Sequence, residues 1–175
     1  MICRRALISD LTVIQAMVSE VVIAMNSQGI NIWDEVYPNE FFSEDIRQQR
    51  LYVLENEGEI VAVFALNDEN SGEKHVQWHY ENGKSMVIDR LAVNVHHARK
   101  GIGMQALRAA MKEAKRMGAD CLRLFVVENN LPAIKLYEKA GFLQADGVYV
   151  EVLDDSFSLN EIGYEICLKE IVGLS

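Results

Sequence analysis

A tight, glycine-containing turn joins an apolar strand to a long helix near the middle of the chain. Residues 91–95 read Leu-Ala-Val-Asn-Val, the turn carries Gly101 and Gly103, and a helix-forming stretch follows. Glycine lacks a Cβ, so the backbone can curl and let a ligand come close. The start of a helix presents unpaired N–H groups and the positive end of its dipole. With Arg99 and Lys100 beside it, this turn is expected to bind a pyrophosphate.

Length and composition indicate a globular chain with an acidic surface. The 175 residues suit one domain with a single core, so a single domain over residues 1–175 is expected. The formal net charge of −9 disfavours general nucleic-acid binding, which requires a basic surface. No apolar run is expected to be long enough to span a bilayer, and residues 1–5 lack the apolar stretch of a secretory signal. Neither a nucleic-acid nor a membrane partner is expected.

The three cysteines and four histidines show no metal-ligand spacing. Cys3, Cys121 and Cys167 lie far apart, and an odd number argues against a disulfide framework. Cys121 and Cys167 lie in apolar runs and are expected to be buried thiols, with no base beside Cys121 to make it a nucleophile. No metal is predicted, and a reducing cytoplasm is the expected location.

Hydrophobic periodicity predicts a mixed α/β (α+β) fold. Ile14, Met17, Val18, Val21, Val22 and Met25 recur at helical spacing after Asp10, a candidate N-cap, and are expected to face the core. Residues 67–84 are polar and predict a long loop. The element order favours a single sheet rather than a doubly wound dinucleotide fold. Strands are expected at residues 2–8, 51–55, 60–66, 86–95, 121–127, 142–151 and 161–170, and further helices at 43–50, 103–117 and 131–140.

The glycine pair by itself is compatible with other phosphate ligands. A nicotinamide-binding domain expects Gly-x-Gly-x-x-Gly, whose last position tolerates the alanine found at Ala106, and an acidic residue after the next strand, where Glu128 stands. That motif is expected near the start of a βαβ unit, whereas about half of this chain precedes it. A nucleoside-triphosphate loop would need Gly-Lys-Ser/Thr, which the chain lacks.

Two motifs, taken together, resemble the GNAT superfamily of N-acetyltransferases. They occur in that family's usual order and separation, so the joint match is more specific than either part. Ile32-Trp33 and Tyr37-Pro38 are also similar to one group of small stand-alone members, which extends the resemblance to nearly the whole chain. The implied fold is a GNAT-like mixed, mostly antiparallel central sheet flanked by helices. The motifs are Leu91-Ala-Val with Arg99-Lys-Gly-Ile-Gly, and Asn130-x-x-Ala133-x-x-Leu136-Tyr137-x-x-x-Gly141-Phe142.

The resemblance implies acetyl-CoA as co-substrate. Helix-start N–H groups would hold its pyrophosphate, and the strand edge would pair with its pantetheine arm. The N–H of Val93 or its neighbour would polarise the thioester carbonyl, worth ~3 kcal/mol for a good donor. Ala98 stands where the family's loop usually has Arg or Gln, so backbone groups are expected to carry the binding. The implied cofactor-binding residues are Leu91, Ala92, Val93, Arg99, Lys100, Gly101, Ile102, Gly103, Met104, Asn130 and Ala133.

The same resemblance implies the acid of the reaction, and the position of Asp89 on the cofactor-binding strand, at the same parity as Leu91 and Val93, suggests the base. Tyr137 would protonate the departing sulfur; its alternative role is that of a core tyrosine on an apolar helix face. Asp89 is the predicted base, with a salt bridge to Arg90 or a surface position as the alternative. Asn130 also suits a helix N-cap. Other carboxylates and the two histidines of the turn are poorer candidates, the histidines being expected in solvent: Glu35, Glu128, His96 and His97.

The acceptor is expected to be a primary amine of a small molecule or peptide. It should lie against the aromatic segment 30–42, with Trp33 and Tyr37, and against the loop near Trp78. The predicted function is therefore direct acetyl transfer to an amine. The alternative is a non-catalytic sensor or interaction module that binds CoA or an acyl-CoA. Edge strands near the C-terminus are compatible with a homodimer.

Overall fold

The computed structural model describes residues 1–154, 157–169 and 171 of the chain. Its contacts separate it into two compact units, each drawn from two stretches of sequence. The first contains Met1–Leu66 and Arg90–Ala109, and the second contains Asn67–Asp89 and the described residues from Ala110 onward. Strand β4 (Ser85–Val93) and helix α3 (Ile102–Arg116) contribute residues to both units. Because neither unit is a continuous segment, the chain does not divide into two consecutive domains.

In the first unit, the strand order is β1-β2-β3-β4. Strand β1 (Ile2–Arg5) pairs antiparallel with β2 (Leu51–Asn56), which pairs antiparallel with β3 (Glu59–Asn67). Glu57 and Gly58 connect β2 to β3 with φ values of 51° and 84°. Positive φ at both central residues is typical of the tight hairpin turns that match strand twist. The turn expected between these two strands is confirmed, and β1 ends sooner than expected.

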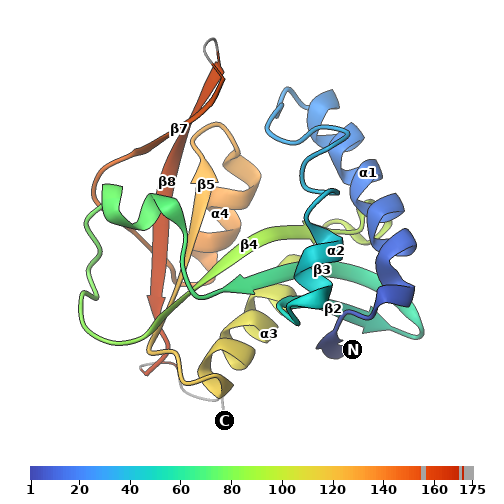
Figure 1. The fold of residues 1–175 in the computed structure, drawn as a ribbon, viewed down its shortest axis with the longest axis horizontal. Helices are drawn as coiled ribbons and strands as arrows, with labels where there is room; N and C mark the ends of the chain where they lie inside the picture. The colour runs from blue at the N-terminus through green and yellow to red at the C-terminus, as the bar shows by residue number, and fades with distance from the viewer. Residues whose placement is uncertain (155–156, 170, 172–175) are drawn as a thin grey trace. The chain divides into compact units, whose positions relative to one another are not determined.

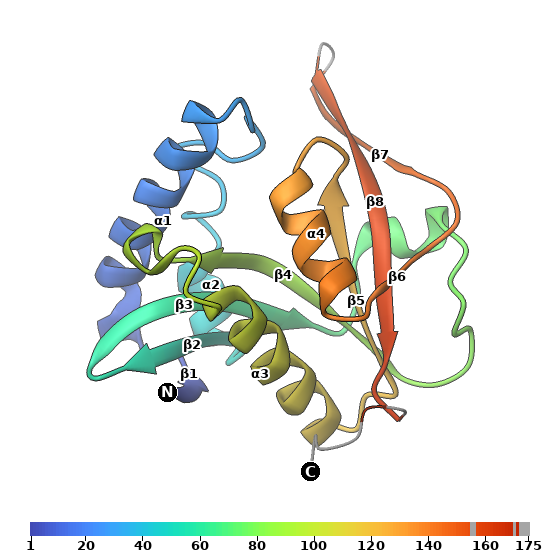
Figure 2. The same ribbon diagram turned by 180° about the vertical axis from the view of Figure 1, so that it is seen from behind.

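Two helices cover one face of these strands. Helix α1 (Leu11–Ser27) and α2 (Phe42–Arg47) share a buried cluster with β2, β3 and Ala92 of β4 (Ser85–Val93). In Figures 1 and 2, α2 lies on one face of β2 and β3, and α3 (Ile102–Arg116) begins on the other. The cluster contains four of the six α1 residues expected in the core, Ile14, Met17, Val18 and Val22, whereas Val21 and Met25 are only partly buried. Its largest other members are Phe42, Ile46, Leu51, Val53, Ile60 and Val63.

The segment Ile8–Ser27 is long and apolar enough, by length and composition, to cross a membrane. The expectation that no run reaches that length was therefore wrong. The reason is that α1 also carries apolar residues on its exposed face, such as Val13 and Ile23. Its opposite face packs into the buried cluster, as in a core helix, so the segment is not evidence of a membrane span. Asp10 does not cap this helix with its side chain; it accepts the N–H of Leu7 instead.

In the second unit, the strand order is β4-β5-β8-β6, and β7 also pairs with β8. Residues Ser85–Ile88 of β4 run parallel to β5 (Cys121–Val127), and β5 pairs antiparallel with β8 (Phe157–Cys167). Strands β6 (Leu143–Gln144) and β7 (Tyr149–Asp154) both pair antiparallel with β8. Together with the first unit, this confirms the expected mixed, mostly antiparallel arrangement flanked by helices.

The strand expected at 142–151 was wrong, because the chain breaks it into β6 and β7. Gly147 has a φ of 100° between the two strands, which a regular strand does not allow. The final strand, expected at 161–170, begins earlier, at Phe157, and ends at Cys167. Strand β8 thus pairs with β5, β6 and β7 along its length.

Different segments cover the two faces of the second unit. Helix α4 (Leu131–Lys139) lies on one face of β5 and β8, and the segment 67–84 lies on the other (Figures 1 and 2). That segment, expected to be a loop, contains a 3-10 turn at Ser71–His75. The register between β5 and β8 agrees with this division of the two sheet faces. Leu124 and Tyr164 form a pair on the α4 face, whereas Arg123 and Glu165 form a pair on the opposite face.

Candidate functional site

The predicted phosphate-binding turn lies in the first unit and leads directly into α3. Arg99 has a φ of 59° and Gly101 a φ of 78°, so the backbone is left-handed on both sides of Lys100. The first backbone bond of the helix runs from Gln105 N–H to Gly101 O at 3.2 Å. The N–H groups of the residues just before Gln105 therefore have no acceptor within the helix. Such a turn at a helix start forms a concave set of donors suited to an anion.

Open space surrounds this turn. A Cβ added to Gly101 would meet no heavy atom within 4 Å, so the glycine is required by its backbone conformation and not by packing. Arg99, Lys100 and Gly101 are exposed, whereas the Ile102 side chain is buried. The main-chain groups and cationic side chains predicted to bind a pyrophosphate thus occur together at one exposed turn.

Asn94 anchors the turn to the rest of the first unit. Its side chain accepts the His96 N–H at 3.0 Å and donates to Glu59 at 3.3 Å, and its own N–H donates to Val61 O at 2.9 Å. His97 also contacts Glu59, at 3.0 Å, and its side chain is only 19 % exposed. The expectation that His97 lies in solvent was therefore wrong, while His96 is exposed as expected. The sequence analysis missed Asn94, although a polar residue between two valines at a strand end could have indicated it.

The aromatic segment of the first unit forms a chain of edge contacts. The ring centroids of Trp33 and Tyr37 are 6.3 Å apart, and those of Tyr37 and Phe41 are 5.5 Å apart. Asp34 accepts the N–H groups of Val36 and Tyr37, each at 2.7 Å, which shapes the turn between the rings. Trp33 also packs against the buried cluster. Both predicted acceptor-binding aromatics of this segment are half-buried side by side.

Trp78 belongs to the second unit, where a hydrogen bond and ring contacts hold its side chain in place. Its indole Nε1 donates to Glu73 O at 2.9 Å, and its ring packs against Phe125 and the guanidinium of Arg123. A Cβ at Gly163 would come within 2.9 Å of the ring, so that glycine makes room for the indole. Trp78 therefore fastens the segment 67–84 to the sheet, whatever further role it has.

Tyr137 is a buried residue of α4, 8 % exposed. Its ring lies 6.1 Å from Phe142 and 6.2 Å from Tyr164. Burial raises the pKa of the Tyr137 hydroxyl well above its usual value, so the group keeps its proton at physiological pH. At the start of the same helix, the Asn130 side chain accepts the Ala133 N–H at 3.4 Å, which confirms its N-cap role.

Asp89 lies in the second unit among polar and acidic neighbours. Asn67 donates its side-chain amide to one carboxylate oxygen, and Asn70 lies 3.4 Å from the other. Arg90, the neighbour considered as a partner for Asp89, forms a two-bond pair with Asp45. Two further carboxylates interact electrostatically with Asp89: Glu151 on β7 and Glu161 on β8. We call these three residues, Asp89, Glu151 and Glu161, the carboxylate cluster.

Strand register explains why the cluster forms. Glu161 stands directly opposite Tyr149 of β7 and Val127 of β5, on the sheet face that the segment 67–84 covers. Burial, with the charges of Glu151 and Asp89, raises the pKa of Glu161 to about 7. Burial and the Asp89 charge also raise the pKa of Glu151. The sequence analysis missed both glutamates, because only the pairing of distant strands brings them to Asp89.

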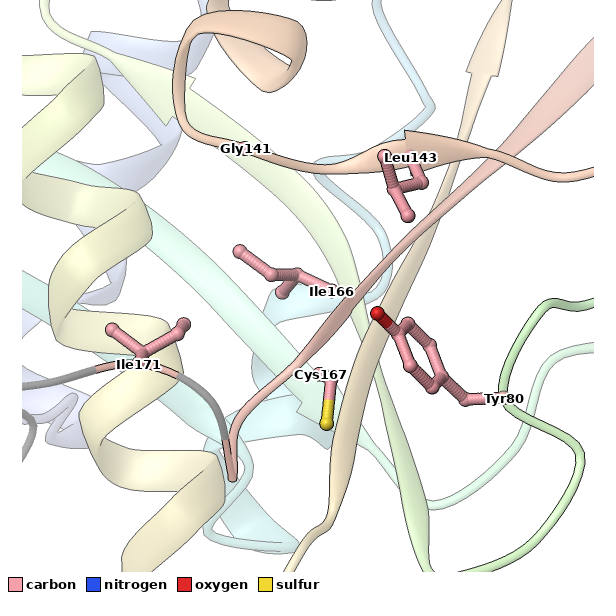
Figure 3. A pocket seen from close by; sticks show the side chains of 6 residues that line it. All are labelled: Tyr80, Gly141, Leu143, Ile166, Cys167 and Ile171. Carbon is pink, nitrogen blue, oxygen red and sulfur yellow. The ribbon is translucent and has the colours of Figure 1, made fainter.

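A small cavity in the second unit contains none of the predicted site residues (Figure 3). Its volume of about 250 Å³ is small for an organic ligand. Cys121 and Cys167 are buried free thiols, as expected, and burial raises the pKa of Cys121 to about 11. Within the described ranges, no three His, Cys, Asp or Glu side chains are arranged to hold a metal ion. The cavity is lined by Tyr80, Gly141, Leu143, Ile166, Cys167 and Ile171.

Comparison with known proteins gives one family match. A family model described as "Acetyltransferase (GNAT) family" matches residues 20–142. This range contains both sequence motifs, the turn predicted to bind a pyrophosphate and Tyr137. A search of curated proteins found no match.

Solved structures share the fold over nearly the whole chain. A GNAT-family acetyltransferase from Streptococcus agalactiae superposes with a TM-score of 0.80 at 17 % identity, covering 95 % of this chain and 94 % of that one. The protein yncA from Salmonella typhimurium, solved with its cofactor acetyl-CoA, has a TM-score of 0.70 at 18 % identity, covering 98 % and 95 %. A ribosomal-protein-alanine N-acetyltransferase from Brucella melitensis has a TM-score of 0.70 at 20 % identity, covering 95 % and 99 %.

Proposed function

The chain belongs to the acetyltransferase (GNAT) family, and we propose that it transfers an acetyl group from acetyl-CoA directly to a primary amine of a small molecule or peptide. The observation that carries this proposal is the exposed main-chain turn at residues 99–104, which leads into α3. It offers donors to a pyrophosphate and stands within the matched range. Acetyl-CoA, when bound, supplies the activated acetyl thioester.

The residues present fit this co-substrate. The N–H groups of Gly101, Gly103 and Met104, with Arg99 and Lys100, would hold the pyrophosphate. The strand end Leu91–Val93, which lies beyond the residues of β4 that pair with β5, would bind the acyl arm through its backbone. A backbone N–H there would stabilise negative charge developing on the carbonyl oxygen. Asn130 and Ala133, at the start of α4, are further proposed contacts.

Tyr137 and Asp89 are the proposed proton donor and acceptor. The Tyr137 hydroxyl keeps its proton at physiological pH, as an acid for the departing thiolate must. Asp89 would take the proton of the attacking amine. Glu161 is a second candidate for that step, since a carboxyl with a pKa of about 7 is suited to accept a proton near neutral pH. Asp89→Asn and Glu161→Gln, compared by the pH dependence of kcat/KM, show which of the two carboxylates accepts the proton.

Substitution of Gly101 tests the turn. Gly101→Ala should weaken acetyl-CoA binding about tenfold in titration calorimetry, because alanine at a φ of 78° costs about 1–2 kcal/mol and will shift the turn. Gly58→Ala is a matched control in the same unit, since Gly58 has a φ of 84° and equally open surroundings. The control should lose similar stability and keep its affinity. Equal affinities in the two variants would contradict a phosphate site at this turn.

Trp33 tests the proposed acceptor segment. Trp33→Ala should raise the KM for the amine by about tenfold and leave acetyl-CoA affinity unchanged, because an aromatic contact to a ligand is worth about 0.5–1.5 kcal/mol. The experiment measures thiol release from acetyl-CoA over a panel of amines. Unchanged kinetics with every acceptor would show that Trp33 serves only packing, to which its contact with the buried cluster contributes.

The second candidate function is a CoA or acyl-CoA sensor. It is favoured if acetyl-CoA binds tightly but no amine in the panel releases thiol. We further propose that the chain works as one domain over residues 1–175 in the cytoplasm. The discontinuous composition of both units supports the single domain. A homodimer is also proposed, and sedimentation at several protein concentrations tests it.

A further inference from the structure

A buried carboxylate on α2 binds two arginines of the first unit. Asp45 is 0 % exposed. Arg50 Nε donates to Asp45 Oδ1 at 2.6 Å, and Arg90 donates from Nε to Oδ2 at 2.8 Å and from Nη2 to Oδ1 at 3.1 Å. A charged carboxylate without water is tolerated only when it is paired and hydrogen-bonded in this way. The arrangement therefore fixes both arginines with respect to α2.

Arg90 has an unusual backbone conformation for a strand residue. Its φ is 54°, within β4 and directly before the strand end Leu91–Val93. A non-glycine residue in this left-handed region costs about 1–2 kcal/mol and persists where surrounding contacts determine it. Here these contacts include the two-bond pair with Asp45 and the Phe41 ring, whose centroid lies 5.4 Å from the guanidinium carbon. Both come from the chain around α2.

The same helix also holds the strand end by apolar packing. Ala92 is 2 % exposed and belongs to the buried cluster that contains Phe42 and Ile46 of α2. Helix α2 thus holds Arg90 through charge and is packed in one cluster with Ala92. Leu91 lies between these two residues, so α2 holds the residues on both sides of it in place.

We infer that Asp45 is a positioning residue for acetyl transfer: through Arg90 it sets the backbone conformation of Leu91–Val93, whose N–H groups polarise the thioester carbonyl. This inference rests on the proposed function. Asp45 exchanges no proton and makes no bond to substrate. Its effect comes from geometry, since a donor displaced by a fraction of its hydrogen-bond length loses much of its stabilisation of the reacting oxygen.

Asp45→Asn is the direct test. It keeps the size of the side chain and removes the charge that holds the Arg90 fork. We expect kcat to fall about ten- to hundredfold. Acetyl-CoA affinity should change by less than about threefold, because the charged turn at 99–104 contributes most of it and the Leu91–Val93 backbone contributes less. The matched control is Asp10→Asn, which removes a carboxylate 2.7 Å from Arg4 in the same unit. The control should lose stability without losing kcat.

A comparison of alanine and glycine at position 90 separates backbone positioning from simple loss of an ion pair. In the Asp45→Asn background, Arg90→Gly should retain several times the kcat of Arg90→Ala, because only glycine adopts a φ of 54° without cost. If the ion pair between Asp45 and Arg90 has only a structural role, the two double variants should lose kcat equally. Where Asp45→Asn does not fold, Arg90→Lys replaces it, since lysine keeps the charge but not the two-bond geometry.

A spectroscopic measurement makes the test independent of the acceptor. The carbonyl stretch of bound acetyl-CoA, labelled with carbon-13 at the acetyl carbonyl, should lie at lower frequency in the wild type than in water, and Asp45→Asn should reverse most of this shift. If no amine is acetylated but the variant still reverses the shift, the proposed function fails and the positioning role stands. Wild-type kcat and carbonyl frequency in Asp45→Asn, or in a folded Arg90→Lys, would overturn the inference.

Discussion

Replacing Tyr137 by phenylalanine should lower kcat by about a hundredfold or more, because a positioned proton donor contributes about 10²–10⁴-fold to a transfer reaction. The substitution removes only the hydroxyl. Its ring contacts with Phe142 and Tyr164 remain, so stability and acetyl-CoA affinity should hardly change. Single-turnover measurements of thiol release isolate the chemical step. The elevated pKa of Tyr137 further predicts that its contribution stays constant from pH 6 to pH 9.

Tyr164 supplies the matched control for this substitution. It is also a buried tyrosine on the α4 face, with its hydroxyl 3.4 Å from Glu138 and 3.5 Å from Gln144. Tyr164→Phe should leave kcat within about twofold of the wild type. Equal and small effects of the two substitutions would assign Tyr137 to core packing, which is the alternative that its burial also supports.

Local sequence predicted those parts of the site that lie on one continuous segment. The turn at 99–104 follows from two glycines ahead of a helix, and the N-cap role of Asn130 follows from the residues next to it. The break between β6 and β7 was not predicted, although Asp146-Gly147 is a dipeptide typical of turns and Gly147 has the positive φ that interrupts the strand. The Arg90 conformation was equally hidden, because its cause is Asp45, distant in sequence.

The carboxylate cluster shows the same limit for a functional candidate. Glu151 stands between two valines and Glu161 between Asn160 and Ile162, a pattern that predicts ordinary exposed strand positions. The two glutamates lie near Asp89 only because β8 pairs with both β5 and β7. No periodicity within either segment carries that information.

Glu161→Gln should make the protein more stable at alkaline pH. The pKa of Glu161 rises from 4.5 to about 7 in the folded protein, so the folded state binds this proton more tightly than the unfolded chain does. The contribution of the protonated carboxyl is fully present below pH ~4.5 and is lost as the pH rises through about 7. At about 1.4 kcal/mol per pKa unit, ionisation of Glu161 costs the wild type about 3 kcal/mol by pH 8, relative to pH values below 4.5. Glutamine does not ionise and avoids this cost.

Urea unfolding at pH 5 and pH 8 measures the effect. The difference in unfolding free energy between Glu161→Gln and the wild type should grow by about 2–3 kcal/mol between these two values. Glu128→Gln, which removes an exposed carboxylate bonded to Asn160, controls for the loss of one negative charge from an acidic protein. If both variants change equally, general charge repulsion explains the gain. A gain specific to Glu161, with the inflection of kcat/KM near pH 7 abolished, would indicate a residue kept for proton transfer at the expense of stability.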